Sequence, residues 1–412
     1  MSTDGRPSRR LVVLGGSGAS TPELADAIAT WPGGDERRPH LEIVLHGRSR
    51  PKLELVADAF RRRVATLDPP VAVTTAEDLE QALDGVDAIL NQVRVGGLAA
   101  RESDETFPHA FGLPGEETMG PGGAANAMRT VPALAPTWEI IARRAPEATV
   151  INLTNPSGIV VGTAVRSFGL RIVSVCDSPV TLTEAVSARL ERDLDSVRQR
   201  YIGCNHVGWW MPLRVSDLDR VSDLATGLDP ESVAIAGALP GPYVRYYLAP
   251  DRVLAAQRAS KPRAVELQAL QAAQLEAYAS GAEAAPRRGA IWYAKAVVPF
   301  LDAWWGGSDA PQILGLPTDG TVPGIPAGVV VERAVRLSEP GSLELLPPPA
   351  LETYPGAVLA AHAAYEALMI DALATGAERR ALVRAMAANP MVRGLDQAAA
   401  IVDRILESSP RG

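Results

Sequence analysis

The sequence predicts an α/β protein with a Rossmann-like parallel sheet in its first part and a mixed, helix-rich α+β second part. Two observations support this. Short apolar runs alternate with helical segments through the first 180 residues, and the first run ends in a glycine-rich turn that leads into a helix. Beyond residue 180 this alternation stops and longer helices dominate. We therefore place a domain boundary there, between residues 1–180 and 181–412.

The composition bounds the kinds of partner. A chain of 412 residues is long enough for two cores. Its 40 Lys and Arg residues stand against 48 Asp and Glu, and no basic run suits a nucleic acid. Two cysteines without a secretory context, and no apolar run of roughly 20 residues, favour a reduced compartment away from the membrane. We expect a cytoplasmic protein with a small-molecule partner.

A glycine-rich turn follows the first predicted strand, residues 11–14. Glycines let the backbone approach a pyrophosphate, and the helix predicted over residues 23–29 offers it free N–H groups and a positive dipole end. A tight turn without a ligand has the same pattern, but its place at the start of an α/β chain favours a dinucleotide. The turn residues that we assign to the cofactor are Gly15, Gly16, Ser17, Ser20 and Thr21.

The second strand, residues 41–45, lacks the terminal acidic residue that normally holds the adenosine ribose. His46, Gly47 and Arg48 stand there instead, and Arg50 follows. An arginine here is compatible with the 2′-phosphate of NADP, and equally with a solvated loop that leads into the next helix. Arg48 is a further cofactor candidate, and we predict NAD with NADP as the alternative.

The same alternation continues to residue 175. The remaining elements expected in this half are helices over residues 51–66, 130–144 and 160–168, and strands over residues 71–73, 88–90, 148–152 and 171–175. Asn91 and Val93 follow the strand at 88–90 and are assigned to the cofactor. The glycine-rich residues 112–123 predict a shaped loop rather than a core element.

Two soft metal-ligand candidates lie just beyond predicted strands. Cys176 and His206 suit a divalent transition metal, although two ligands fall short of a closed structural zinc site. A buried cysteine and a hydrogen-bonded core histidine explain the same residues. The polar neighbours Asp177, Asn155 and Asn205 favour an open site, because ligands bind beyond the carboxyl ends of parallel strands. Asp177 also fits a cap of the following helix.

The second half is predicted to contain a long helix over residues 181–198, a strand at 200–203 and a helix near 262–279. Tyr243, Tyr246 and Tyr247 lie in a segment with Arg245, where a tyrosinate near a metal could remove a carbon-bound proton; aromatic packing is the alternative, and spacing alone does not choose among the three. Alanine-rich helices from residue 354 onwards predict a packing surface for a dimer or tetramer.

Several motifs in sequence resemble glycoside hydrolase family 4, the NAD- and metal-dependent 6-phosphoglucosidases and α-galactosidases. The resemblance runs along residues 10–405, and its motifs are Arg94–Gly97, Arg101 with Asp104–Glu105, Gly115–Gly123, Arg129–Thr130, Thr154–Pro156, Cys176–Asp177, Asn205–Trp210 and Tyr243–Tyr247. It implies a fold like that of lactate and malate dehydrogenases. It also implies a glycosidase, one of the exceptions to the usual two-carboxylate hydrolysis.

The implied reaction oxidises sugar C3 with NAD, removes the C2 proton, eliminates the C1 leaving group and adds water before the hydride returns. The resemblance implies that Cys176 and His206 hold a divalent metal, Mn²⁺ in most members. Asp177 is the acid of members that cleave α-linked substrates. Tyr243 resembles the base, with Tyr247 as its alternative. The residues that resemble substrate contacts are Arg94, Asn155, Asn205 and Arg263.

Two positions depart from the family pattern. Arg48 lies where the family has an acidic strand end, and Glu116 replaces the glutamine of the Gly-Gln-Glu-Thr motif. An alternative function on the same scaffold is an NAD(P)-dependent sugar or cyclitol C3 dehydrogenase.

Overall fold

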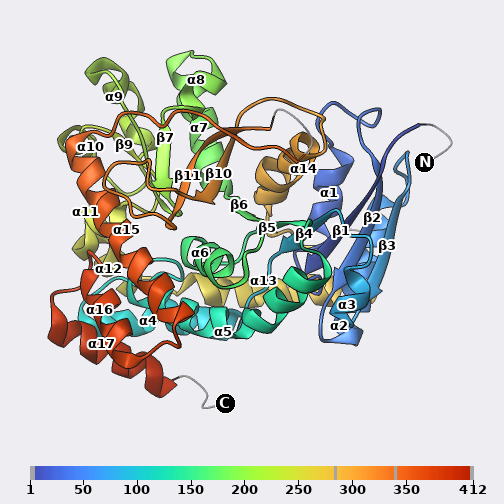
Figure 1. Cartoon of the computed structure of the whole chain (residues 1–412), viewed down its shortest axis with the longest axis horizontal. Coiled ribbons are helices and arrows are strands. Elements are labelled where there is room, and N and C mark those ends of the chain that lie inside the picture. Colours follow the sequence, from blue (N-terminus) through green and yellow to red (C-terminus); the bar gives the residue numbers. More distant parts are fainter. Residues whose placement is uncertain (1–4, 283–284, 338–340, 409–412) are drawn as a thin grey trace.

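A parallel sheet with a helix on each connection forms the first half of the protein (Figure 1). The computed structural model describes residues 5–282, 285–337 and 341–408. The first six strands have the order β3-β2-β1-β4-β5-β6 and pair in parallel. Their bounds are β1 Ser8–Leu14, β2 His40–His46, β3 Val71–Ala76, β4 Ala88–Asn91, β5 Thr149–Asn152 and β6 Ile172–Ser174.

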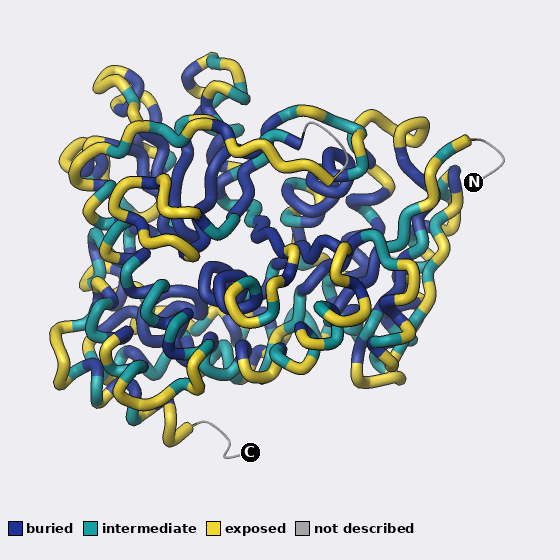
Figure 2. Tube along the Cα trace, viewed as in Figure 1, coloured by how far each residue is buried: buried dark blue, intermediate teal, exposed yellow. Residues whose placement is uncertain are grey.

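The central strands are apolar because they are covered on both faces. Every residue of β4, β5 and β6 is buried, as is typical of parallel strands with helices on either side. The tube in Figure 2 is correspondingly dark blue along these strands. The connecting helices are α1 Glu23–Ala29, α2 Arg50–Val64, α3 Leu79–Ala82, α4 Gly97–Thr106, the 3₁₀ helix η1 Phe107–Phe111, α5 Gly120–Arg144 and α6 Ser157–Phe168.

The second half adds helices and extends the same sheet. Its strands are β7 Tyr201–Cys204, β8 Val207–Trp210, β9 Leu239–Pro240, β10 Gln312–Pro317, β11 Val330–Arg336 and β12 Glu344–Leu345. Strand β10 pairs antiparallel with β6, and β11, β7, β8 and β9 follow in that order. The sheet is therefore continuous across residue 180, where the domain boundary stays a prediction.

The helices of the second half form three groups. The first precedes the long middle helix and contains α7 Asp177–Leu190, α8 Leu194–Arg198, α9 Val215–Val221, η2 Ser222–Leu224, α10 Pro230–Ala236, α11 Arg245–Leu248 and α12 Pro250–Arg258. The middle group is α13 Arg263–Ser280, the π-helix η3 Tyr293–Val297 and α14 Val298–Trp304. The last group is α15 Thr353–Ala374, α16 Arg379–Ala388 and α17 Leu395–Ser408.

Helix α15 is the one described helix that is long and apolar enough to span a membrane by length and composition, with a mean hydropathy of 1.4. It contacts α16 on one side and α6 on the other. Its His362 and Glu366 are both buried, where a lipid-facing helix would expose apolar side chains. These contacts identify α15 as a core helix of this fold.

The long helix predicted over residues 181–198 is wrong in two respects. It begins at Asp177, four residues earlier, and it ends at Leu190, where Glu191 adopts a left-handed conformation with φ 53°. A second helix, α8, starts at Leu194 after Asp193 caps it by accepting a hydrogen bond from the Ser196 N–H at 2.9 Å. Asp177 is thus the first residue of α7 rather than a cap ahead of it.

The shaped loop predicted over residues 112–123 extends only to residue 119, and it belongs to the core, contrary to the prediction. Residues 113–123 are buried, and Gly120–Gly123 form the first turn of α5. Glycines are required there because backbones touch: a Cβ on Gly122 would lie 2.3 Å from the carbonyl oxygens of both Asp104 and Glu116. The glycines therefore serve close packing beneath Glu116.

We expect Gly122→Ala to lower the free energy of unfolding by about 3 kcal/mol, because neither backbone contact can move without shifting a helix. Gly356→Ala, near the start of α15, is the matched control. Its Cβ would meet only Leu351 Cβ, at 3.4 Å, and alanine favours a helix, so we expect unchanged or slightly higher stability. Urea unfolding measures both, and equal effects would contradict this account.

Candidate active site

A cavity of about 540 Å³ lies at the carboxyl ends of the central strands. It is open to solvent and lined by residues from both halves of the chain. Of the residues predicted from sequence, those that line it are Gly15, Ser20, Thr21, Val93, Arg94, Asn155, Cys176, Asp177, Asn205, His206, Tyr243 and Arg263. The structure thus brings the glycine turn, the metal candidates and one tyrosine to the same crevice.

The glycine turn is held against neighbouring strands. Gly15 has φ 80°, and a Cβ there would come 3.1 Å from the carbonyl oxygen of Gln92. The Gln92 side chain donates to Thr21 Oγ1 at 2.9 Å and accepts from the Tyr293 hydroxyl at 2.7 Å. Residues far apart in sequence therefore fix the turn in an open conformation at the edge of the cavity.

Four cofactor candidates lie outside the cavity wall. Gly16 packs on β2, where a Cβ would be 2.9 Å from Leu45 Cα. Ser17 and Arg48 lie at the end of the same strand, beyond the cavity. Asn91 is buried and donates to Asn152 Oδ1 at 2.8 Å, so its side chain serves the sheet.

Cys176 and Asp177 connect β6 to α7 and face the cavity. Burial raises the pKa of the Cys176 thiol well above its usual range, and the charges of Glu332 and Asp177 raise it further. Burial also raises the pKa of Asp177. The apolar surroundings thus favour the neutral forms of both groups when no cation is near.

His206 lies in the two-residue turn between β7 and β8, in a left-handed conformation with φ 69°. Burial lowers the pKa of His206 to about 4, so its imidazole is neutral at pH 7. Its Nδ1 is buried without a hydrogen-bond partner among the described residues, as is Oδ1 of the adjacent Asn205. The side-chain nitrogen Nδ2 of Asn205 donates to Glu332 Oε1 at 2.8 Å, and this hydrogen bond fixes the turn.

Tyr243 stacks on His206, with ring centroids 3.9 Å apart and planes 4° from parallel. Burial raises the pKa of Tyr243, and Glu116 beside it adds to the effect. Tyr247 lies elsewhere: its hydroxyl is 2.7 Å from His362 Nδ1, and it does not line the cavity. The structure therefore places one of the two tyrosine candidates, Tyr243, where a bound substrate could reach it.

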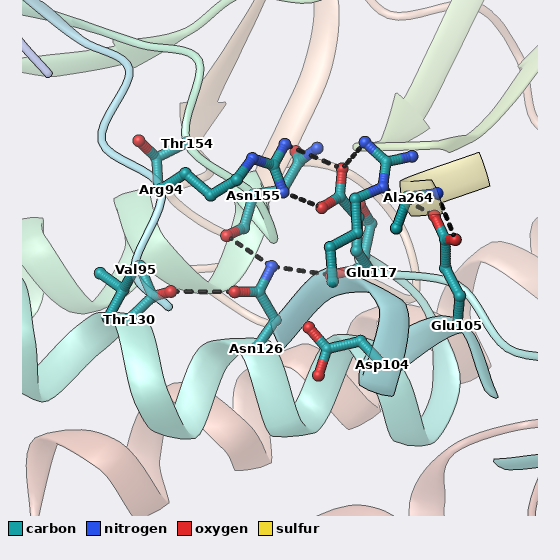
Figure 3. A network of polar contacts seen from close by, with 12 residues as sticks. Arg94, Val95, Asp104, Glu105, Glu117, Asn126, Thr130, Thr154, Asn155 and Ala264 are labelled. Atoms are coloured by element: carbon teal, nitrogen blue, oxygen red, sulfur yellow. Dashed lines mark hydrogen bonds and ion pairs between the residues drawn. The ribbon is translucent and has the colours of Figure 1, made fainter. Parts of the chain in front are cut away.

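Paired arginines and carboxylates form the floor of the cavity (Figure 3). Arg94 hydrogen-bonds Glu117, and Arg101 forms an ion pair with Glu117 Oε1 at 2.9 Å and donates to Glu105 Oε1 at 2.7 Å. Burial alone would raise the pKa of Glu117, but Arg94 and Arg101 overcome it and lower the pKa to about 2. Glu117 is ionised, and it holds both arginines in place.

Glu116 lies beside this cluster. Its Oε2 accepts from the backbone N–H groups of Thr118 at 2.6 Å and Met119 at 2.9 Å, and is 4.0 Å from His206 Nδ1. Burial and the charge of Glu117 raise the pKa of Glu116 to about 7. When Glu116 is ionised, it adds a negative charge next to the predicted metal ligand His206.

The candidates Asn155 and Arg263 both line the cavity. Asn126 Nδ2 donates to the backbone oxygen of Asn155 at 3.1 Å, as Figure 3 shows. Arg263, at the start of α13, is more than half exposed and pairs with Glu266. Both therefore line the cavity without a strong interaction with the metal candidates.

Sequence reasoning missed Arg288. It lines the cavity next to Trp292, with its guanidinium 4.9 Å from the ring centre, and has no ion pair with any residue that the structure describes. Burial and repulsion from Arg94 and Arg101 lower the pKa of Arg288 to about 10. It belongs to a segment without periodicity, so no sequence signal pointed to it. The floor residues Arg101 and Glu117 lay in quoted motifs but were given no role.

The two predicted metal ligands fit an open site. Among residues 5–282, 285–337 and 341–408, no group of three His, Cys, Asp or Glu is arranged to hold a metal ion. The unsatisfied imidazole nitrogen of His206 and the thiol of Cys176 nevertheless face the same cavity. This donor set suits a transition metal that completes its coordination with ligand oxygens.

Comparison with known proteins gives the family. The model of the family described as "Family 4 glycosyl hydrolase" matches residues 12–192. The model of that family's C-terminal domain matches residues 201–392. The chain belongs to glycosyl hydrolase family 4. The predicted membership is confirmed, and with it the predicted enzyme class, a glycosidase.

A probable 6-phospho-β-glucosidase of Bacillus subtilis is 26% identical over 430 residues, covering 97% of this chain and 96% of the relative. The 6-phospho-β-glucosidase of Thermotoga maritima, solved with NAD and glucose 6-phosphate, is 23% identical with a TM-score of 0.85, covering 97% and 98% of the two chains. A 6-phospho-α-glucosidase from gut microorganisms, solved with NAD and Mn²⁺, is 20% identical with a TM-score of 0.81, covering 98% of each chain. These structural matches confirm the predicted fold class.

We expect Glu117→Gln to lower the free energy of unfolding at pH 7 by about 3 kcal/mol, because it leaves the half-buried Arg94 without a counter-charge and Arg101 with Glu105 alone. The pKa of Glu117 is about 2 in the folded protein, below its ordinary 4.5. Its stabilisation is therefore present above pH 4.5 and is lost as the pH falls from 4.5 towards 2. The difference between wild type and variant should shrink over that range in urea unfolding.

Asp403→Asn is the control for this prediction. It breaks the ion pair between Arg379 and Asp403 on α16 and α17, whose side chains are about half exposed. An exposed pair contributes at most about 1 kcal/mol. A loss in Glu117→Gln no larger than in this control would show that the buried cluster does not stabilise the cavity floor.

Proposed function

We propose that this protein hydrolyses a hexoside, with a 6-phosphorylated α-linked hexoside as the preferred substrate class, using NAD and Mn²⁺. The observation that carries the proposal is one cavity that joins a dinucleotide-type glycine turn to Cys176, His206 and Tyr243. Family membership supplies the reaction class. Of the two related structures described above, one was solved with NAD and glucose 6-phosphate and the other with NAD and Mn²⁺.

The cofactors supply chemistry that no side chain here can perform: when bound, the dinucleotide takes and returns a hydride, and the metal polarises the sugar oxygens. Cys176 and His206 would hold the metal. Asn205, fixed by Glu332, orients the His206 turn. A metal held by only these two side chains would complete its coordination with substrate oxygens.

Proton transfer falls to Tyr243 and Asp177. Tyr243 lines the cavity and is held flat against the His206 ring, so its hydroxyl keeps one orientation next to the predicted metal. A cation there would favour the tyrosinate, which can remove the C2 proton. Asp177, at the start of α7, lies beside Cys176 and can donate a proton to the leaving group.

Positive side chains support an anionic substrate. Arg288 has no ion-pair partner among the described residues, and Arg263 lies at the start of α13 on the rim of the same cavity. The phosphate of a phosphorylated sugar could pair with either of these two arginines. The α-linkage in the proposal follows from Asp177, the acid that directly follows Cys176.

A homo-oligomer is a further expectation. Leu395 and Leu406 of α17 are 66% and 39% exposed, and Tyr354 of α15 is 48% exposed. Apolar side chains at this end of the molecule would be covered in a dimer. Light scattering of the purified protein tests this, and a monomer at all concentrations would exclude it. A cytoplasmic location stays a prediction.

A substrate screen tests the function. Nitrophenyl α- and β-glucosides and galactosides, each with and without a 6-phosphate, are incubated with NAD and Mn²⁺. We expect cleavage of a 6-phosphorylated α-glycoside, loss of activity with EDTA and recovery with Mn²⁺. Net accumulation of NADH without release of nitrophenol would instead identify a sugar dehydrogenase, and cleavage independent of NAD would contradict the proposed route.

We expect Tyr243→Phe to lower kcat by about 10²–10⁴-fold, the usual contribution of a general base. Tyr247→Phe is the matched control, because its hydroxyl contacts His362 outside the cavity, and we expect kcat within a few-fold of wild type. Substrate deuterated at C2 should react more slowly with the wild type. If the control loses activity and Tyr243→Phe does not, the roles of the two tyrosines are reversed.

A further inference from the structure

The end of β2 adjoins the glycine turn at the place where a bound dinucleotide would put its adenosine ribose. The Gly16 N–H donates to the carbonyl oxygen of His46 at 2.9 Å, which joins the turn to the last residue of the strand. A Cβ on Gly47 would lie 3.2 Å from Ser17 Oγ, so these two residues are in contact. In sheets of this topology the ribose hydroxyls bind at this strand end.

The charge at this position is positive. Between β2 and α2 the chain reads His46, Gly47, Arg48 and Ser49, with no carboxylate to accept hydrogen bonds from a ribose. The nearest acidic residue of the adjoining strand end, Glu77, is half exposed and 3.8 Å from Arg50. A neutral ribose with a free 2′-hydroxyl would therefore meet no acceptor of the usual kind here.

Arg48 is available for a ligand. Its side chain is exposed, and it makes no hydrogen bond or ion pair with any residue in the described part of the chain. The hydroxyl of Ser49, the residue before α2, makes no capping hydrogen bond. A planar guanidinium with a neighbouring hydroxyl suits a phosphate dianion, because it can donate two parallel hydrogen bonds.

We propose that Arg48 binds the 2′-phosphate of NADP, and that this protein takes NADP(H) at least as well as NAD(H). The inference rests on the proposed function as far as a dinucleotide occupies the glycine turn. It differs from that function in the cofactor, since the related structures described above were solved with NAD. Arg48 thereby becomes a residue that determines cofactor specificity.

Binding measurements test the proposal without reference to turnover. Calorimetry on the full chain gives the Kd of NAD, NADP, 5′-AMP and 2′,5′-ADP, where the last two differ only in the 2′-phosphate. We expect NADP to bind at least as tightly as NAD, and 2′,5′-ADP more tightly than 5′-AMP. Arg48→Ala should weaken NADP and 2′,5′-ADP by about 10–100-fold and leave NAD within about twofold, since only the charge-assisted contacts are lost.

Arg62→Ala is the matched control, because Arg62 is an exposed arginine at the far end of the same helix. It should leave all four constants unchanged. Arg48→Asp should favour NAD over NADP, since an acid at this position accepts from the ribose hydroxyl and repels a phosphate. Arg48 and Arg62 are both exposed, so none of the three substitutions at these positions should affect folding.

The outcomes separate this inference from the proposed function. NAD binding with NADP more than tenfold weaker, or an Arg48→Ala protein that binds NADP like wild type, would overturn the role of Arg48 alone. Failure of both dinucleotides to bind would overturn this inference together with the cofactor in the proposed function. A preference for NADP that Arg48→Ala removes supports both.

Discussion

The geometry of the cavity depends on a single backbone pairing between the two halves of the sheet. β6 and β10 meet at Ser174 and Gly315, and a Cβ on Gly315 would come 2.8 Å from Ser174 Cβ. Only a residue without a side chain allows so close an approach. Cys176 follows two residues after this junction on one side, and β11 and β7 lead from it to His206 on the other. The separation of the two predicted metal ligands is thus set by the packing of two strands, which is more rigid than a loop.

Two buried carboxyl groups, those of Glu332 and Glu117, hold neighbouring side chains of the site in place. Glu332, on a central strand, accepts from Tyr201 at 2.6 Å and from Asn205 at 2.8 Å, so a buried carboxyl group couples β11 to the turn that carries His206. Glu117 does the same for Arg94 and Arg101 on the cavity floor. Apolar residues of similar size would pack these places at lower desolvation cost. The polar groups are therefore best explained by the positions that they impose on their partners.

The sequence allowed the first half of the fold to be predicted, because its strands are continuous apolar runs that only a two-sided core explains. The predicted helix at residues 23–29 has the same bounds in the structure. β10 and β11 escaped prediction, since Glu332 and Arg333 interrupt the apolar pattern of β11 although both are buried. The glycine-rich residues 112–123 predicted a loop throughout, because a sequence does not distinguish glycines that form a turn from glycines that allow two backbones to touch.

The site was predictable to the extent that strand ends meet at one edge of a parallel sheet. This rule alone predicts that Cys176, Asp177 and the glycine turn lie together. It could not choose between Tyr243 and Tyr247, because four residues of chain turn the second tyrosine towards His362 and away from the cavity. The strand-end rule could not predict Arg288, because this residue reaches the cavity from a different segment. The backbone N–H of Arg288 donates to Glu23 Oε1 at 2.9 Å and anchors that segment.

Desolvation acts in the same direction on the remaining titratable groups of the cavity. Burial raises the pKa values of Cys176, Asp177 and Tyr243 and lowers that of His206, so without a cation each of them favours its neutral form. A divalent cation held by Cys176 and His206 must therefore displace the thiol proton, and its charge would then stabilise the anionic forms of its neighbours. A base next to such a site need not be basic before the metal binds. The stacking of Tyr243 on His206 is then more than packing, because it keeps the phenol within the field of any ion that the imidazole ligates.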